Sequence, residues 1–331
     1  MVTTSQGPHR PSTSLDVAQR AGVSRSTVSN ILNGRGDRFP TATRERVLAA
    51  AAELDYRPSL AGRTLVSGRS DTVVLLVPNT TFGSNLQDAV DAVVTRTRQI
   101  GGNVVVRFAS PTATETTASV AALQPLAVVD FGVLSEVERD EVEQSGAIVV
   151  PGATRGPTRP LDAGIGALQA QALLASGPRT LWFAALSDAR SDPYGPARLE
   201  AIAAYCRDEG LPSPRQVSVP LALSGATRAL AHLLRDEGPV GVACYNDDVA
   251  IALLAAARSA GVDVPSTLAV VGVDHTQVGQ LWTPPLTTVD TDLPGHVSAL
   301  ASELSARLDG RTREEIELVP PRFTLVEGGT T

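Results

Sequence analysis

A short run near the start of the chain carries side chains that can read the edges of DNA bases. Arg25, Ser26, Ser29 and Asn30 take the outward positions of one predicted helix. An arginine can donate two hydrogen bonds to the two acceptors of a guanine edge, and serine or asparagine can form hydrogen bonds with neighbouring bases. We therefore expect Arg25, Ser26 and Asn30 to read sequence in the major groove of DNA, with Ser29 beside them.

Two short helices and a tight turn are predicted to hold this run in place. Thr13 and Asp16 have capping-box spacing at the start of the first helix. Gly22 can adopt the left-handed conformation that ends a helix, and Ser24 can cap the next one. The inward positions of the two helices are apolar: Val17, Ala18, Ala21, Val28, Ile31 and Leu32.

A third helix is predicted at about 41–54, with Val47, Leu48, Ala51 and Leu54 on its inward face. Three short helices around a small core form a helix-turn-helix unit. Polar residues of this unit that are placed to contact phosphates are Thr13, Thr27, Asn33, Arg35 and Arg38. The alternative is an ordinary helical hairpin whose polar face is only solvated.

The charge of the chain is divided unevenly. Residues 1–69 carry a net charge of +5, whereas the rest of the chain carries −12. A basic N-terminal head (residues 1–69) on an acidic body (the rest of the chain) indicates that the head binds a polyanion. The charge alone supports nucleic-acid binding only weakly, since a few surface arginines can cluster by chance.

After residue 70, short β-branched runs alternate with helical stretches. Strands are predicted at 72–78, 103–108, 126–131, 147–150, 180–185, 240–245 and 268–273. Helices are predicted around 85–100, 163–176, 195–209, 225–236 and 247–260. Buried strands that alternate with helices are typical of parallel sheets covered on both faces, and the length of this body predicts two α/β lobes.

The head and the body both resemble the lactose-repressor (LacI/GalR) family of bacterial transcription regulators. In the head, the similar segments are DVAQRAGVSRSTVSNILNG, TRERVLAAAAELDYRPS and GRTL. In the body, the similar segment begins YNDDVAIALL and ends TPPLTTV. The resemblance implies a homodimeric regulator, most simply a repressor, that binds a near-palindromic DNA operator and whose body is a periplasmic-binding-protein-like pair of lobes around a small effector.

The resemblance also implies a hinge helix after the head. In the family, two hinge helices pair in the minor groove and each inserts a leucine, which corresponds to Leu65 here, with Ser59 and Arg63 beside it. The usual Ala-Leu-Ala-Arg is replaced by Leu-Ala-Gly-Arg, and a glycine costs about 1 kcal/mol of helix propensity. We expect a hinge that orders on operator DNA, and simple linker packing of Leu65 is the alternative.

The family comparison sets the expected domain boundaries. These are a disordered tail at 1–12, a helix-turn-helix domain at 13–57, a hinge at 58–70 and an effector-binding and dimerisation domain at 71–331. Within the last, lobe 1 is expected at about 71–177 and 291–318, and lobe 2 at about 178–290 and 319–331. The chain is thus expected to pass between the lobes near 177–179, 290 and 318.

Ligands of open α/β lobes lie beyond the carboxyl ends of the strands. The positions that match the family's effector contacts there are Phe82, Asn85, Arg198, Asn246, Asp274 and Trp282. The alternatives are salt links between lobes for Arg198 and Asp274, a helix cap for Asn246, and core or interface packing for Trp282. The family's stacking aromatic pair is missing near Phe82, so a sugar, a nucleoside, a related metabolite and a lobe without effector all stay open.

Other classes of function fit the sequence poorly. It has no phosphate-binding glycine loop, no nucleophile elbow and no metal spacing among its histidines, and the acidic pair Asp247-Asp248 opens a predicted helix, where acids favour the dipole. We expect no enzyme activity, cofactor or metal. A solute-binding protein for transport shares the two-lobed fold but requires export, and this chain has a basic head instead of a signal peptide.

The hydropathy of the chain and its two cysteines predict a cytoplasmic protein. No run of 18 apolar residues is present, so no membrane span is expected. Cys206 and Cys244 match no metal or redox spacing and are interpreted as small core residues of a reduced, cytoplasmic chain.

Overall fold

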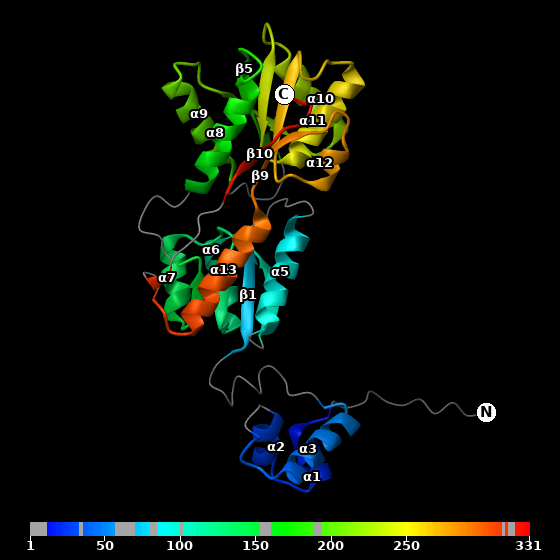
Figure 1. Cartoon of the computed structure of the whole chain (residues 1–331), viewed down its shortest axis with the longest axis vertical. Helices are drawn as coiled ribbons and strands as arrows, with labels where there is room; N and C mark the ends of the chain where they lie inside the picture. The colour runs from blue at the N-terminus through cyan, green and yellow to red at the C-terminus, as the bar shows by residue number, and fades with distance from the viewer. Residues whose placement is uncertain are drawn as a thin grey trace, which may run out of the picture. The chain divides into compact units, whose positions relative to one another are not determined.

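The computed structural model describes residues 12–32, 36–56, 70–79, 85–99, 102–110, 112–152, 160–187, 194–312, 315–316 and 322–331. The chain divides into two compact units, Met1–Asp71 and Thr72–Thr331. The first unit is helical and the second is α/β (Figure 1). The predicted fold class, a helix-turn-helix head and a body with two mainly parallel sheets, is confirmed.

The described residues of the head form α1 (Ser14–Ala21), α2 (Arg25–Leu32) and α3 (Thr41–Glu53). Each of the three contacts the other two around one small core. The buried members of this core are Val17, Ala18, Ala21, Val28, Ile31, Val47, Ala50 and Ala51. A core this small depends on every member, because few other apolar contacts support it.

Leu48 does not belong to the head core, contrary to the prediction. Its side chain is 54% exposed, whereas Ala50, which the prediction omitted, is buried. Val47, Ala50, Ala51 and the partly buried Leu54 follow the i, i+3, i+4, i+7 spacing of one helix face. Leu48 lies about 100° round the helix from Val47 and therefore faces solvent.

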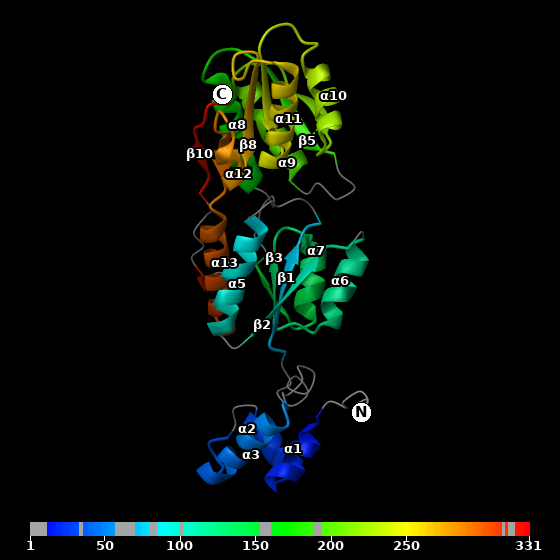
Figure 2. The same cartoon turned by 90° about the vertical axis from the view of Figure 1, so that its right-hand side faces the viewer.

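The first sheet of the body has four parallel strands in the order β2-β1-β3-β4. They are β1 (Thr72–Val77), β2 (Asn103–Phe108), β3 (Ala127–Asp130) and β4 (Ile148–Val150). The side chains of β1 alternate: Val73, Leu75 and Val77 pack with α5 (Asn85–Gln99) and α13 (Leu293–Leu308). Val74 and Leu76 pack with α6 (Ala113–Ala122) and α7 (Glu136–Gln144) on the other face (Figure 2).

The second sheet has six strands in the order β10-β9-β8-β7-β5-β6. These strands are β5 (Thr180–Leu186), β6 (Arg215–Val219), β7 (Val240–Cys244), β8 (Leu268–Val273), β9 (Thr287–Asp290) and β10 (Thr324–Val326). All pairings are parallel except that β10 runs antiparallel to β9. The large core around this sheet includes both cysteines, which are free and buried as predicted.

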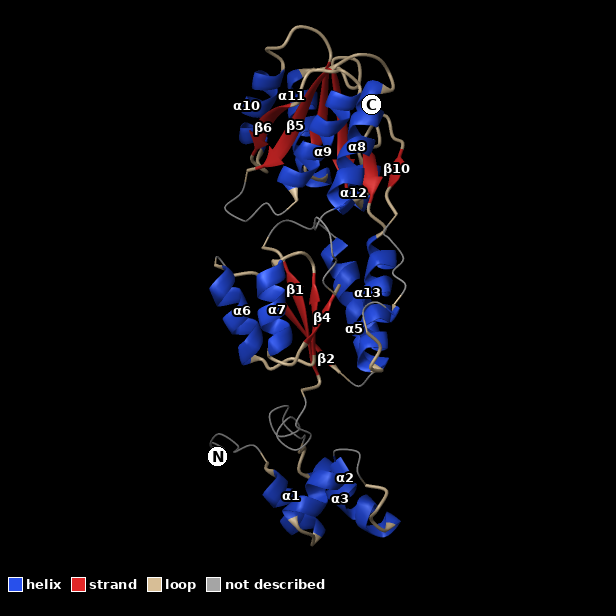
Figure 3. Ribbon diagram, turned by 90° about the vertical axis from the view of Figure 1, so that its left-hand side faces the viewer, coloured by secondary structure: helices blue, strands red, loops and turns tan. Residues whose placement is uncertain are grey.

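Helices cover both faces of the second sheet (Figure 3). The helix α8 (Pro160–Leu174) packs against α9 (Gly195–Asp208), and α10 (Leu223–Leu233) packs against α11 (Asp247–Ala260). The short α12 (Gln277–Leu281) follows β8 and contacts α11.

The helix α8 corrects the predicted passage between lobes near 177–179. Its Ile165, Ala170 and Leu173 belong to the core of the six-stranded sheet. The Gln169 amide nitrogen also donates to the carbonyl oxygen of Cys244 at the end of β7, 2.8 Å away. Because α8 is buried against the second sheet, the chain has already left the first sheet before Pro160.

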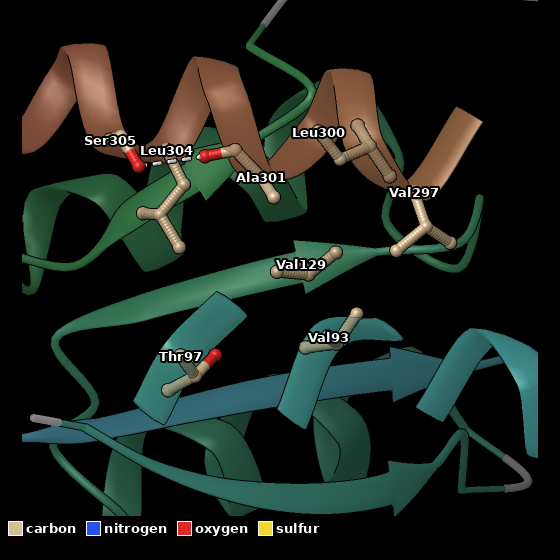
Figure 4. A pocket seen from close by; sticks show the side chains of 8 residues that line it. All are labelled: Val93, Thr97, Val129, Val297, Leu300, Ala301, Leu304 and Ser305. Atoms are coloured by element: carbon tan, nitrogen blue, oxygen red, sulfur yellow. Dashed lines mark hydrogen bonds between the residues drawn. The ribbon is translucent and has the colours of Figure 1, made fainter. Parts of the chain in front are cut away.

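A small cavity lies between α5, β3 and α13 (Figure 4). Its lining is apolar apart from two hydroxyls, those of Thr97 and Ser305, and Ser305 donates to the carbonyl oxygen of Ala301. The volume of about 20 Å³ accommodates roughly one water molecule. It is far too small for a metabolite, whose sites usually enclose hundreds of Å³.

Candidate DNA interface and ligand site

Hydrogen bonds at both helix starts fix the geometry of the head. Thr13 and Asp16 form the predicted capping box on α1, and Gly22 ends that helix with a φ of 66°. Ser24 accepts from the backbone nitrogen of Thr27 at 3.1 Å, which caps α2 as predicted. Since the caps set where each helix begins, they also set which side chains stand at the exposed end of α2.

Arg25 opens α2 and is exposed. Its Nε donates to the Ser14 hydroxyl at 2.9 Å, which ties the base of the guanidinium to α1. Within the described part of the chain, its two Nη groups donate to no other residue. They form a planar fork of donors, the group that matches a guanine edge.

The other predicted reading residues lie along the same helix. Ser26 is exposed, and its hydroxyl is 2.8 Å from that of Ser24. Ser29 and Asn30 are half-buried, and the Asn30 amide nitrogen donates to the Ser26 carbonyl at 2.8 Å. This bond fixes the amide and leaves its carbonyl oxygen as the atom able to accept from a base.

The predicted phosphate contacts are only partly described. The Thr13 hydroxyl serves the capping box, the Thr27 hydroxyl lies 2.8 Å from Ser24, and the exposed Arg38 lies over the Phe39 ring. The predictions outside the described residues are Asn33, Arg35, Ser59, Arg63, Leu65 and Phe82. Asn85 begins α5, and its side chain also lies outside the description.

Arg198 and Asp274 lie near each other at the carboxyl ends of β7 and β8. Arg198 projects from α9, is buried and donates to the backbone carbonyl of Tyr245, directly after β7. Its guanidinium carbon lies 5.4 Å from the ring centroids of both Tyr194 and Tyr245. The two aromatic faces attract the cation and hold its position.

Asp274 directly follows β8 and is half-buried. Burial raises the pKa of its carboxyl to about 7; the charge of Arg198 opposes this rise, and three nearby carboxylates add to it. The backbone φ of Asp274 is 102°, which L-residues rarely adopt. Strained backbone held in place by its surroundings tends to mark functional positions.

Asn246 caps α11, the alternative that the sequence left open. Its Oδ1 accepts from the backbone nitrogen of Val249 at 3.0 Å. Trp282 ends α12 and packs, partly buried, against the core of the six-stranded sheet. Both residues therefore have structural contacts, and Asn246 lies at the carboxyl end of β7.

The role of Asp247 is not predicted by its sequence context. Its carboxylate is buried and accepts from Thr276 and Thr288, 29 and 41 residues away. Burial raises the pKa of Asp247 to about 6, against the opposing effect of these hydrogen bonds. The only signal in the sequence was the acidic pair Asp247-Asp248 after a predicted strand. Acidic residues at a helix start are usually explained by their favourable interaction with the helix dipole, so the pair did not indicate a tertiary role.

Tyr194 was also missed, and it touches both sheets. Its hydroxyl donates to the backbone carbonyl of Phe131 at 2.9 Å, directly after β3, while its ring lies beside Arg198. No group of three His, Cys, Asp or Glu residues that could hold a metal ion occurs in the described ranges. Among the helices that the structure describes, none is long and apolar enough to cross a membrane.

Comparisons with known proteins cover both units. A family profile described as "Bacterial regulatory proteins, lacI family" matches residues 13–59, and one for a "Periplasmic binding protein-like domain" matches residues 170–331. The HTH-type transcriptional regulator CelR of Thermobifida fusca is 30% identical over 334 residues, covering 92% of this chain and 94% of CelR. The sucrose operon repressor of Klebsiella pneumoniae is 52% identical over 68 residues, 20% of each chain.

A solved structure supports the same fold. The lac repressor dimer bound to operator and the anti-inducer ONPF superposes with a TM-score of 0.76 at 23% identity, covering 97% of this chain and 99% of that one. By name, the two relatives are a transcriptional regulator and an operon repressor. This chain therefore belongs to the lacI family of bacterial transcriptional regulators.

Proposed function

We propose that this regulator is a homodimeric repressor that reads a near-palindromic operator through α2. The observation that carries the proposal is the exposed guanidinium of Arg25, held at the start of α2 by the Ser14 hydroxyl. Ser26 and Asn30 follow on the same helix and read neighbouring bases. Each good base contact contributes roughly 1–3 kcal/mol of discrimination.

Selection of binding sites from a random DNA pool tests this readout. Arg25→Ala is expected to relax preference at one base pair of each half-site. Arg25→Lys is the matched variant: it keeps the charge but lacks the fork, so specificity should relax while the salt dependence of binding stays the same. An equal loss of affinity on all sequences would contradict base readout by Arg25.

The dimer and the hinge form the second part of the proposal. A two-fold protein requires two-fold DNA, so each head reads one half-site. Leu65 inserts at the centre of the operator, flanked by Ser59 and Arg63, and favours a flexible pyrimidine–purine step. The phosphate contacts are made by Thr13, Thr27, Asn33, Arg35 and Arg38.

Leu65→Ala tests the wedge, with Val66→Ala as the neighbouring control. Operator affinity should fall at least tenfold in Leu65→Ala, while affinity for random DNA changes little, because the wedge acts only on bent specific DNA. Unchanged operator affinity would remove the wedge from the mechanism.

We further propose that a small polar metabolite binds at the carboxyl edge of the six-stranded sheet. Arg198 carries guanidinium donors and Asp274 carries carboxylate acceptors, and the two groups are close enough for the charge of Arg198 to affect the pKa of Asp274. A donor group and an acceptor group at one place suit a polar ligand that binds in one orientation. Asn246 lies at this edge, and we propose that Trp282, Phe82 and Asn85 complete the site. Binding modulates operator affinity, a coupling that is typically worth 1–3 kcal/mol.

A thermal-shift screen followed by calorimetry tests the ligand site. A solved CelR structure is a complex with cellobiose, so cellobiose heads a panel of sugars and nucleosides. Asp274→Asn keeps the shape of the side chain but removes its charge and one acceptor oxygen, so it should lower the affinity for the hit at least tenfold. Equal affinity of wild type and Asp274→Asn would exclude Asp274 from the site.

A further inference from the structure

Asp247 lies at the centre of a buried hydrogen-bond cluster, which we call the Asp247 anchor (Asp247, Thr276 and Thr288). One carboxylate oxygen accepts from the backbone nitrogen of Thr276 at 2.7 Å and from its hydroxyl at 3.0 Å. The other accepts from the Thr288 hydroxyl at 2.6 Å. The anchor thereby joins the start of α11, the loop between β8 and α12, and strand β9.

The loop that the anchor holds begins at Asp274. Asp274 and His275 both have positive φ, 102° and 49°. Non-glycine residues in such conformations cost about 1–3 kcal/mol each and persist only when surrounding contacts determine them. The loop therefore needs specific external bonds.

Three consecutive backbone nitrogens supply those bonds. The nitrogen of Asp274 donates to the Val289 carbonyl at 2.9 Å, and that of His275 donates to the Thr288 hydroxyl at 3.3 Å. The nitrogen of Thr276 donates directly to Asp247. The Thr288 hydroxyl in turn donates a hydrogen bond to Asp247. The two amides that follow Asp274 are therefore both linked to one carboxylate, one through Thr288 and one directly.

Steric fit restricts the anchor further. A Cβ atom at Gly272, the residue two before Asp274, would lie 2.0 Å from Oδ1 of Asp247. A Cβ at Gly279 would lie 3.2 Å from Oδ2. The backbone at Gly272 thus approaches the carboxylate so closely that only glycine fits, and the backbone at Gly279 packs tightly on its other oxygen.

We propose that Asp247 is a positioning residue for the ligand site, which holds the backbone of residues 274–276 so that the Asp274 carboxylate is presented to the ligand. Asp247 itself does not contact the ligand. This inference rests on the ligand site proposed above, and it adds that ligand affinity depends on a buried residue of a different element.

Amide hydrogen exchange of the full-length protein, followed by mass spectrometry, tests the inference without any ligand. In Asp247→Ala and Thr288→Val, exchange at residues 275–279 should be at least tenfold faster, while strands β5 and β7 keep wild-type exchange. Thr288→Val keeps the side-chain volume and is the variant that preserves the fold if Asp247→Ala does not. Thr288→Ser restores the hydroxyl and should restore slow exchange.

Asp248→Ala is the matched control for charge. Asp248 is the next residue of α11 and is partly exposed, and it contributes the same favourable charge to the helix start. Loop exchange in this variant should equal that of wild type. Unchanged loop exchange in Thr288→Val and Asp247→Ala, or faster exchange throughout the body, would overturn the inference.

Titration with cellobiose, or with the hit of the screen, gives the functional readout. The Kd of Thr288→Val should rise at least tenfold, and that of Thr288→Ser should return to within about threefold of wild type. If amide exchange at residues 275–279 is faster in Thr288→Val but its Kd is unchanged, the geometry of this loop does not govern ligand binding. If wild type binds nothing in the panel, the proposed ligand site fails; if wild type binds but loop exchange does not respond, only the positioning role fails.

Discussion

The residues at the start of α2 come from one stretch of the chain, whereas those at the carboxyl edge of the six-stranded sheet come from several. Ser24, Arg25, Ser26 and Asn30 are held by bonds to residues at most 11 positions away. At the sheet edge, Arg198 bonds to Tyr245 and Asp247 bonds to Thr276 and Thr288. The first site is built locally and the second by tertiary contacts.

The two sites also differ in exposure. The residues of α2 that are proposed to read bases are exposed or half-buried, as contact with a large DNA surface would require. Arg198 and Asp247 are buried, and burial raises the pKa of both Asp247 and Asp274. A surface that meets DNA can be solvated until binding, whereas a site for a small polar molecule must hold desolvated charges in place beforehand.

The sharpest test of this difference is to break the core of the head alone. Val28→Asp places a charge at a fully buried position and should destabilise the head by more than about 4 kcal/mol. All DNA binding should be lost, and amides of α1–α3 should exchange freely. Tryptophan fluorescence should keep its wild-type unfolding curve, because both tryptophans, Trp182 and Trp282, lie in the body.

Leu48→Asp is the matched control for Val28→Asp. Leu48 faces solvent, so this change should alter the free energy of unfolding of the head by no more than about 0.5 kcal/mol. A loss as large as that of Val28→Asp would mean that Leu48 packs against something in the folded protein after all.

Within the body, a substitution at Gly272 tests the packing around Asp247. Gly272→Ala drives a methyl group into the Asp247 carboxylate and should destabilise the body by about 2–3 kcal/mol. Gly241→Ala is the milder comparison, since its Cβ would lie 3.1 Å from a Leu181 methyl and 3.3 Å from the Leu173 Cβ, and it should cost about 1 kcal/mol. Urea unfolding followed by tryptophan fluorescence measures both, and equal costs would contradict the tight fit around Asp247.

The contrast between local and tertiary construction also explains what the sequence could predict. Capping residues, Gly22 and the apolar faces of α1 and α2 are patterns within about 20 residues, and all of these predictions are confirmed. Short β-branched runs predicted the strands β1 to β5, β7 and β8. The elements that the sequence missed are β6, β9, β10, α6, α7, α12 and α13. Most of them are short or polar, but α13 spans 16 residues and buries Val297, Leu300 and Leu304.

Physical reasons account for the missed elements. The strand β6 reads RQVSV and buries only two side chains, and α7 is mostly charged and buries only Arg139 and Val142. Their structure depends on neighbours that supply the apolar surface, so their own periodicity is weak. The same holds for Asp247, because its role depends on hydrogen bonds from Thr276 and Thr288. No local sequence pattern predicts those two contacts.

The raised pKa of Asp274 should lower the free energy of unfolding of the body at neutral and higher pH. Its pKa is about 7 in the folded protein against 3.8 for the ordinary carboxyl, so the folded state binds more protons between these values. The free energy of unfolding therefore falls as pH rises through this window. Asp274→Asn removes this loss and should be more stable than wild type by about 1–2 kcal/mol at pH 8, with the difference vanishing near pH 3.5.

Urea unfolding curves between pH 3.5 and 8 measure this effect. The same variant should bind the effector poorly, so stability and affinity move in opposite directions. A pH-independent difference between Asp274→Asn and wild type would show that the carboxyl titrates normally in the folded protein.

The smallest expected effect separates two roles of Thr13. Its hydroxyl caps α1, and loss of a cap costs about 1 kcal/mol. Thr13→Ala should therefore destabilise the head by that amount, which hydrogen exchange of α1 measures, and Thr13→Ser should restore it. If Thr13 also contacts a phosphate, Thr13→Ala should weaken binding to operator and random DNA by the same factor at a temperature where the head stays folded. Unchanged DNA affinity there would leave Thr13 only its cap, and the local site would then owe its DNA contacts to α2 and the basic residues that follow it.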